Sequence, residues 1–181
     1  MFLSEIKKGS VKRPVENDPE YGIEAGGGRY IGLHFSPETK EQIKRIIHDE
    51  ALPEPTPLEK LHTTITYSKN NPVKDYSVAG KLEEPINACI DSFDVFPTQD
   101  GNNCLVAKLD CPDCVERHNR TRELGASYDY DEYIPHITLS YNVGDISPDA
   151  LDQLTKKYKG CPIVADEEYD EPLNDDWAKN L

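Results

Sequence analysis

Two stretches of this chain repeat the same order of elements, and this repeat restricts the folds that the chain can adopt. The first unit starts with a strand pattern at Tyr30 and ends at His62, and the second starts at Cys104 and ends at His136. The same number of residues separates the two ends of each unit. Each unit is typical of strand, helix, loop and strand, with turn-forming residues before it and a proline entering the helix. Two such copies predict two related lobes that face each other across a cleft.

The local patterns fill in an α/β (α+β) chain around this repeat. Capping residues and apolar spacing predict helices over residues 36–51, 111–124 and 147–160; Ser36 and Pro37 start the first of them. Alternating or β-branched runs predict strands over residues 29–35, 61–68, 76–83, 86–98, 104–110, 134–141 and 161–173. Residues 1–28 are polar and end in three glycines, which predicts a flexible extension or a flap. Residues 29–181 then form a single domain with two lobes.

Charge and hydropathy limit the partners of the chain. The sequence holds 34 acidic and 20 basic residues, so its net charge is -14, which disfavours binding to long nucleic acids. No segment is apolar enough for a signal peptide or a membrane span. Five cysteines cannot all pair within the chain, and we interpret CPDC (residues 111–114) as two ordinary cysteines at a strand–helix junction. We therefore expect a soluble, cytoplasmic protein with no membrane partner; the oligomeric state stays open.

The end of each unit carries a histidine and, two positions later, a threonine. Residues i and i+2 of a strand point to the same side, so His62 and Thr64 should share a face, as should His136 and Thr138. One His-x-Thr arises easily by chance, but two at equivalent places in a repeat predict a site with two imidazoles and two hydroxyls. The remaining histidines are interpreted as packed or surface residues: His34, His48 and His118.

These groups fit the cleavage of a phosphodiester. In-line displacement needs a base at the attacking oxygen and an acid at the leaving oxygen, and histidine can do either near neutral pH. Threonine hydroxyls can donate to the non-bridging oxygens of the phosphate. The scheme needs no metal or other cofactor, and we expect none. Which histidine is the acid and which is the base stays open.

The motifs HTTITYS and HITLSY resemble those of the two-histidine phosphoesterase superfamily, and the resemblance extends from about Tyr30 onward. It implies a bilobal fold in which two pseudo-symmetric antiparallel sheets surround a central cleft, with flanking helices. Together with the tyrosine of the first strand, the ending EYDEPLNDDW is most similar to that of the phage anti-CBASS phosphodiesterases. That family cleaves the cyclic di- and trinucleotide messengers of a bacterial antiphage system.

The resemblance also implies substrate-binding residues outside the two motifs. Tyr30 matches the tyrosine of the family's first strand, and its ring is suited to stacking on a base. A late glutamate of the family corresponds to Glu168 or Glu171, of which we prefer Glu168.

These observations predict a phosphodiesterase that hydrolyses 3′–5′ bonds of cyclic oligonucleotides in the cytoplasm of an infected bacterium and so counteracts its defence. Two alternatives stay open. One is an enzyme of the same superfamily that acts on RNA ends or 2′,3′-cyclic phosphates. The other is a protein that sequesters the messenger without cleaving it, for which both histidines would not be needed. Base preference and ring size stay open in every case.

Overall fold

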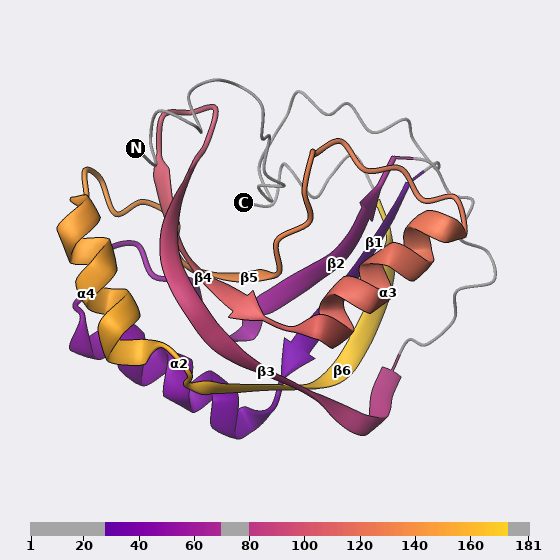
Figure 1. Ribbon diagram of the computed structural model, residues 1–181, viewed down its shortest axis with the longest axis horizontal. Helices are drawn as coiled ribbons and strands as arrows, with labels where there is room; N and C mark the ends of the chain where they lie inside the picture. Colours follow the sequence, from indigo (N-terminus) through magenta and orange to yellow (C-terminus); the bar gives the residue numbers. More distant parts are fainter. Residues whose placement is uncertain (1–27, 70–79, 174–181) are drawn as a thin grey trace.

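The computed structural model describes residues 28–69 and 80–173, and these form one curved antiparallel sheet with helices packed against it (Figure 1). The predicted extension lies outside the described residues, apart from Gly28. The elements follow in the order β1 (Arg29–Phe35), α2 (Pro37–Asp49), a 3₁₀ turn (Leu58–Lys60), β2 (His62–Ser68), β3 (Gly80–Pro97), β4 (Asn103–Asp110), α3 (Pro112–Glu123), β5 (His136–Ser140), α4 (Pro148–Tyr158) and β6 (Pro162–Pro172).

The sheet consists of two three-stranded halves. Its strand order is β2-β1-β6-β3-β4-β5, and all neighbouring strands are antiparallel. The first half holds β2, β1 and β6, the second holds β3, β4 and β5, and the pairing of β6 with β3 joins them. The repeat units β1–α2–β2 and β4–α3–β5 therefore occupy equivalent places in the two halves. The predicted fold class is confirmed, with the two predicted sheets joined edge to edge into one.

The curvature of this sheet brings its two edge strands together. β2 and β5 lie at opposite ends of the strand order, yet Figure 1 shows them side by side in the middle of the molecule. The hydroxyl of Thr63 in β2 donates to the carbonyl oxygen of His136 in β5 at 3.0 Å. The proline-rich loop before β2 also binds β5, since the backbone N–H of Thr56 donates to the carbonyl of Leu139. The ends of both repeat units therefore meet.

Each helix begins as its sequence predicts. The side chains of Ser36 and Ser147 accept a hydrogen bond from the backbone N–H three residues later, and a proline follows each of them. Cys111 caps α3 in the same way. Its sulfur is joined to that of Cys114 in a disulfide, so the interpretation of CPDC as two ordinary cysteines is wrong. All three helices contribute to one hydrophobic core on the same face of the sheet.

One strand differs from its prediction. Residues 76–83 and 86–98 predict two strands, but residues 80–97 form the single strand β3. Lys81 pairs with Glu167 of β6, and the next pair along the strand joins Ile86 to Ala165. β3 thus carries extra residues that do not pair with β6, and the charged, proline-containing sequence of residues 82–85 resembles a loop although the strand continues through it.

Candidate active site

The strands β2 and β5 present their two motifs on the face of the sheet opposite the core. Along β2 and β5 the burial alternates, with Thr63 and Ile137 buried between more accessible neighbours. These neighbours are half-buried and lie on one face of the sheet, which we call the histidine face. They are His62, Thr64, His136 and Thr138.

A β-bulge follows each motif at the same place. In the β1–β2 ladder Ile31 pairs with Thr66 and Gly32 with Thr64, so the register skips Ile65. In the β4–β5 ladder Leu139 is skipped in the same way, directly after Thr138. A bulge bends its strand and changes the direction of the following side chains. Both bulged side chains are fully buried, so the pseudo-symmetry of the two halves extends to the irregularities of their strands.

Both histidines are anchored by an identical hydrogen bond. Nδ1 of His62 lies 2.7 Å from the carbonyl oxygen of Lys60, and Nδ1 of His136 lies 2.8 Å from that of Ile134. A carbonyl oxygen can only accept, so each Nδ1 carries a proton and donates it. The neutral imidazole then has its lone pair on Nε2. Each ring is therefore fixed in the tautomer in which Nε2 can take up a proton and later release it.

Tyr30 connects the first histidine to its threonine. Its hydroxyl lies 2.8 Å from Nε2 of His62 and 2.5 Å from the hydroxyl oxygen of Thr64. Because Nε2 of the neutral ring is an acceptor, the tyrosine donates to it and can accept from the threonine. The structure thus brings Tyr30 into direct contact with one histidine and one threonine of the site.

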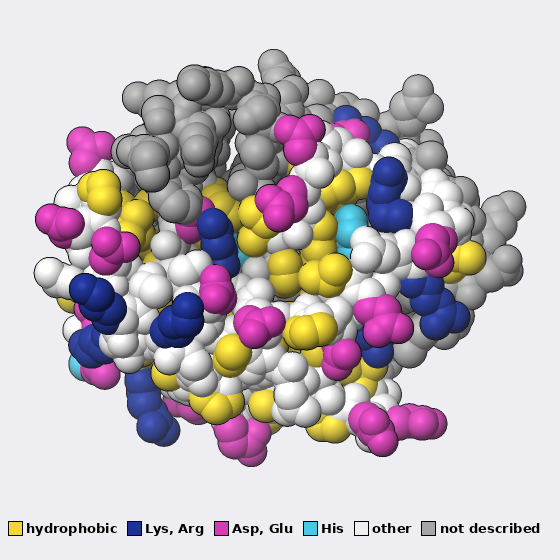
Figure 2. Space-filling model, viewed as in Figure 1, with side chains coloured by type: hydrophobic (Ala, Val, Ile, Leu, Met, Phe, Trp, Pro, Cys, Tyr) yellow, Lys and Arg dark blue, Asp and Glu magenta, His cyan; other side chains and the backbone are white. Residues whose placement is uncertain are grey.

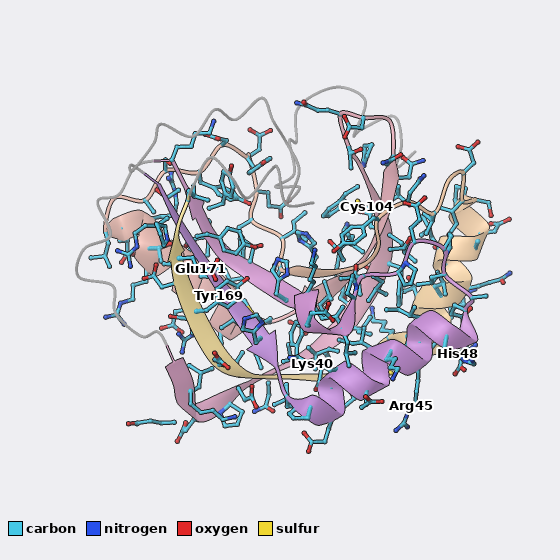
Figure 3. All side chains as sticks on the ribbon, turned by 180° about the vertical axis from the view of Figure 1, so that it is seen from behind. Lys40, Arg45, His48, Cys104, Tyr169 and Glu171 are labelled. Atoms are coloured by element: carbon cyan, nitrogen blue, oxygen red, sulfur yellow. A yellow bond between two sulfur atoms is a disulfide. The ribbon has the colours of Figure 1, made fainter. Side chains whose placement is uncertain are left out.

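The two candidate glutamates lie on opposite faces of β6. Glu168 pairs in register with Leu33 on the core face, is 1% exposed, and forms an ion pair of 2.6 Å with Arg117 of α3. Glu171 pairs with Tyr30 and is exposed; Figure 3 shows it on β6, two residues beyond Tyr169. The preference for Glu168 therefore does not fit the geometry.

A bulge in β6 is the physical reason for this difference. Phe35 pairs with Ala165 while His34 pairs with Glu167, so β6 contains one extra residue at this point. A shift of one residue exchanges the two faces of a strand. Counting alternate positions from the buried Ile163 and Ala165 therefore predicts the wrong face for every residue after the bulge.

Sequence reasoning missed two aromatic residues of the histidine face. His34 is the cross-strand partner of His62, and Tyr169 of β6 lies against the ring of His34 with ring centroids 4.3 Å apart. Burial lowers the pKa of His34, and the nearby His62 and Lys40 add to this effect against the opposing charge of Glu167. The sequence could have predicted the position of His34. It lies four residues after Tyr30, and residues an even number of positions apart share a face of a strand.

The second half of the histidine face carries an ion pair in place of these rings. Lys108 is the cross-strand partner of His136, and its ammonium lies 2.7 Å from the carboxylate of the buried Asp94. The ring of Phe96 packs edge-on against that of His136, with centroids 4.9 Å apart. The two histidines therefore have similar anchors but different neighbours.

The other two histidines lie away from this face. His48 is exposed at the end of α2, next to Asp49. His118 is 5% exposed, donates from Nδ1 to the carbonyl oxygen of Ile65 at 2.7 Å, and stacks on Tyr133. Both fit the prediction of surface or packed residues.

Metal ligands and surface charge are dispersed in the described part of the chain. Within residues 28–69 and 80–173 no three His, Cys, Asp or Glu side chains gather in a metal-binding group. On the face drawn in Figure 2, Lys and Arg alternate with Asp and Glu and form no continuous basic stripe among the described residues. Every helix in the same two ranges is too short or too polar to traverse a lipid bilayer.

An antiparallel α+β fold of two related halves, each with a histidine anchored through Nδ1 beside a threonine, defines a two-histidine phosphoesterase. The family model described as Anti-CBASS protein Acb1 matches residues 27–180, and the chain belongs to this family. The predicted family and the predicted class of enzyme, a phosphodiesterase, are confirmed.

Individual relatives agree with this assignment. The anti-CBASS protein Acb1 of Enterobacteria phage T4 is 40% identical over 154 residues, which cover 85% of this chain and 93% of the relative. That of Salmonella phage S16 is 38% identical over 154 residues, with the same coverage of both chains. The crystal structure of the protein TT0787 of Thermus thermophilus has the same fold, with a TM-score of 0.50 at 16% identity over 79% of this chain and 83% of that chain.

Proposed function

We propose that this protein is a phosphodiesterase that opens cyclic di- and trinucleotide messengers at a 3′–5′ bond and so counteracts CBASS antiphage defence in the cytoplasm of an infected bacterium. The observation that carries the proposal is the shared anchoring of His62 and His136. Each ring is in the tautomer in which Nε2 is the acceptor, and in this proposal the substrate takes the place of Tyr30 at Nε2 of His62. The contact between Thr63 and the His136 backbone holds their strands together. Family membership supports the choice of substrate.

The reaction divides into two proton transfers at one phosphorus. One imidazole takes the proton of the ribose 2′-hydroxyl, whose oxygen attacks the neighbouring phosphorus. The bond from phosphorus to the 5′-oxygen breaks, and the other imidazole, protonated at Nε2, gives its proton to that leaving oxygen. The ring opens to a linear nucleotide with a 2′,3′-cyclic phosphate at one end and a 5′-hydroxyl at the other. Water can then hydrolyse the cyclic phosphate through the same pair of histidines with their roles exchanged.

The other residues of the histidine face have supporting roles in this proposal. Thr64 and Thr138 donate hydrogen bonds to the non-bridging oxygens, where negative charge grows in the transition state. With substrate bound, Tyr30 donates to Thr64 instead of His62, so the Thr64 hydroxyl can donate to the phosphate. Tyr30 and Glu171, which are cross-strand neighbours, bind the nucleoside part of the substrate. Glu168 is left out of the substrate contacts because its carboxylate is held by Arg117 on the other face.

The test is an incubation of the full chain with 3′–5′ cyclic di- and trinucleotides in excess chelator, with products separated by chromatography. We expect linear products from the ribose substrate and none from its 2′-deoxy analogue, because the analogue has no nucleophile. Each of His62→Ala and His136→Ala should lower kcat by about 100-fold or more, as expected for loss of a general acid or base. Loss of activity in chelator would contradict the metal-free scheme.

Two further outcomes would assign a different function. Binding of the intact messenger without any linear product would identify a sequestering protein. Rapid cleavage of a tRNA-derived fragment with a 2′,3′-cyclic phosphate, without cleavage of cyclic dinucleotides, would identify an RNA-end enzyme. Equal cleavage of the ribose and 2′-deoxy forms would overturn the 2′-hydroxyl mechanism.

A further inference from the structure

The two halves of the histidine face are equivalent in backbone but not in side chains. Beside the first motif, position 32 of β1 is a glycine and its partner in β6 is Tyr169. Beside the second motif, the corresponding position of β4 is Val106 and its partner in β3 is Asp94. The first half therefore has room for a large ring over its central strand, whereas the second half does not.

Tyr169 occupies the space over Gly32. A Cβ atom added to Gly32 would lie 2.5 Å from both Cζ and the hydroxyl oxygen of Tyr169, which is closer than side chains approach one another. Gly32 is buried and has no side chain, so the tyrosine ring lies directly on the β1 backbone. Close approach of this kind is one of the reasons for a glycine within a strand.

The ring of Tyr169 lies between two other rings of the same face. It is nearly parallel to the ring of His34, at 4.3 Å and 24°, and to that of Tyr30, at 5.9 Å and 23°. It also approaches the ring of His62 edge-on, with centroids 6.5 Å apart. Offset stacked and edge-to-face pairs at such distances favour a defined arrangement of the rings. Rotation of the Tyr30 ring toward β6 would bring it into contact with Tyr169.

Tyr30 transmits this restraint to the reacting groups. Its hydroxyl is bonded to Nε2 of His62 and to the hydroxyl of Thr64, so a rotation of the Tyr30 ring would move this hydroxyl away from both. The equivalent position in the second half is Cys104, whose thiol donates to the carbonyl oxygen of Tyr141, and the ring of Phe96 packs on His136 there. The two histidines thus depend on different supports.

We propose that Tyr169 is a positioning residue of the reaction, which acts through Tyr30 on His62 and Thr64, and that Gly32 provides the space it needs. This inference deepens the proposed function and rests on it for its kinetic readout. The ring, not the hydroxyl, supplies the contacts to Tyr30 and His34. Removal of the ring should therefore lower kcat more than it changes the binding of the substrate, because misplacement of a catalytic group mainly affects the transition state.

The experiment compares Tyr169→Leu, Tyr169→Phe and Gly32→Ala in the full chain. We expect Tyr169→Leu and Gly32→Ala to lower kcat by about 100-fold, the scale for a catalytic group displaced by about 1 Å. Their Kd for the uncleavable 2′-deoxy cyclic dinucleotide should rise by a much smaller factor than kcat falls, because Tyr30 is only one of the groups that bind the nucleoside. Tyr169→Phe keeps the ring and should therefore retain much more of the parent's kcat than Tyr169→Leu does. Ile86→Val, a core change away from the histidine face, is the control for a mere loss of stability.

A second readout keeps this inference separate from the proposed function. Nitrogen NMR of the histidine side chains reports the hydrogen bond from Tyr30 to Nε2 of His62 without any substrate. The Nε2 resonance of His62 should move in Tyr169→Leu and stay in place in Tyr169→Phe. One outcome is that the parent protein shows no cleavage of any substrate while the resonance still moves as expected in Tyr169→Leu. In that case the proposed function fails and the positioning role stands. If the Leu and Phe variants behave alike in kcat and in the resonance, the positioning role is overturned.

Discussion

Burial makes two histidines outside the proposed reaction harder to protonate. Burial lowers the pKa of His34 and of His118, and for His118 the positive charge of Arg122 acts in the same direction, against the bond to Ile65. His34 lies next to His62 across the β1–β2 ladder. An uncharged His34 avoids a second positive charge beside a histidine that must itself change protonation state.

These shifts make the stability of the fold depend on pH. In the unfolded chain each histidine takes up a proton near its ordinary pKa of 6.5, whereas the folded protein resists it until a lower pH. The unfolded state therefore binds more protons below this value, and the free energy of unfolding falls as pH falls from about 7 toward 5. Each histidine can contribute up to about 1.4 kcal/mol per pH unit within that window.

Urea unfolding of the parent and of His118→Asn at several pH values checks this prediction. Asparagine keeps an N–H that can donate to the carbonyl oxygen of Ile65 but does not titrate, so the variant should show a shallower fall between pH 7 and 5. Parallel curves for the parent and the variant would contradict a role for His118 in the pH dependence.

Residue spacing alone predicted the two motifs but not their surroundings. The period of two along a strand is enough to place His62 with Thr64 and His136 with Thr138. The preference for Glu168 came from the resemblance and not from spacing, and the extra residue in β6 places Glu168 on the core face. A bulge leaves no clear mark in the residue types. Tyr169 was missed for a related reason, since its importance depends on Gly32, which is distant in sequence and adjacent only after β1 and β6 pair.

At the scale of elements, α3 supports the first half of the sheet although it belongs to the second repeat unit. His118 binds the carbonyl of Ile65, the bulged residue of β2, and the hydroxyl of Thr121 lies 2.5 Å from that of Thr66. In the middle of the helix Arg117 pairs with Glu168 of β6. The helix therefore fixes β2 just after its His-x-Thr motif, so the second repeat unit supports the site residues of the first.

The ion pair between Arg117 and Glu168 gives a prediction for this element. Glu168 is 1% exposed, so Arg117→Met would leave a buried carboxylate without the cation that pairs with it. We expect the free energy of unfolding to fall by about 3 kcal/mol, as for removal of one partner from a buried pair. Urea or thermal denaturation measures this change.

The double variant Arg117→Met with Glu168→Gln is the matched control, because it removes the buried charge together with its partner. It should recover a substantial part of the lost stability. If the double variant is no more stable than Arg117→Met, then the loss comes from the packing of the arginine side chain and not from the charge of Glu168.

The ends of helices were predictable because capping residues mark them. The ends of a strand were not predictable where they depend only on pairing with a distant strand. Ser36 and Ser147 begin α2 and α4 as their sequences predict. The residues around Pro85 resemble a loop, yet β3 runs through them, because its pairing with β6 resumes on the far side. Pairing of this kind is a property of two distant segments, and no local pattern reports it.

At the scale of the whole molecule, the two halves meet at two places with different chemistry. β6 and β3 are joined by a ladder of backbone hydrogen bonds. β2 instead meets β5 through the hydroxyl of Thr63, which donates to the carbonyl of His136. The loop before β2 adds bonds to β5 from the hydroxyl of Thr56 to Thr138 and from its backbone N–H to Leu139. The repeat in the sequence predicted that both motifs would converge, but it did not reveal that hydroxyl-to-backbone bonds close the gap between them.

The bond from Thr63 therefore tests whether closure of the sheet places the two histidines for reaction. Thr63→Val keeps the shape of this buried side chain but loses its hydrogen bond to the backbone of His136. We expect the free energy of unfolding to fall by about 1 kcal/mol, the usual net value of one such bond. We expect kcat to fall by about tenfold or more, because the two rings must flank one phosphorus and small displacements are costly.

Thr39→Val is the matched control, since its buried hydroxyl accepts a bond from the backbone N–H of Val164, far from the motifs. Thr39→Val should lose similar stability and keep the parent's kcat. Equal kcat values for Thr63→Val and Thr39→Val would show that closure through Thr63 does not set the distance between the histidines.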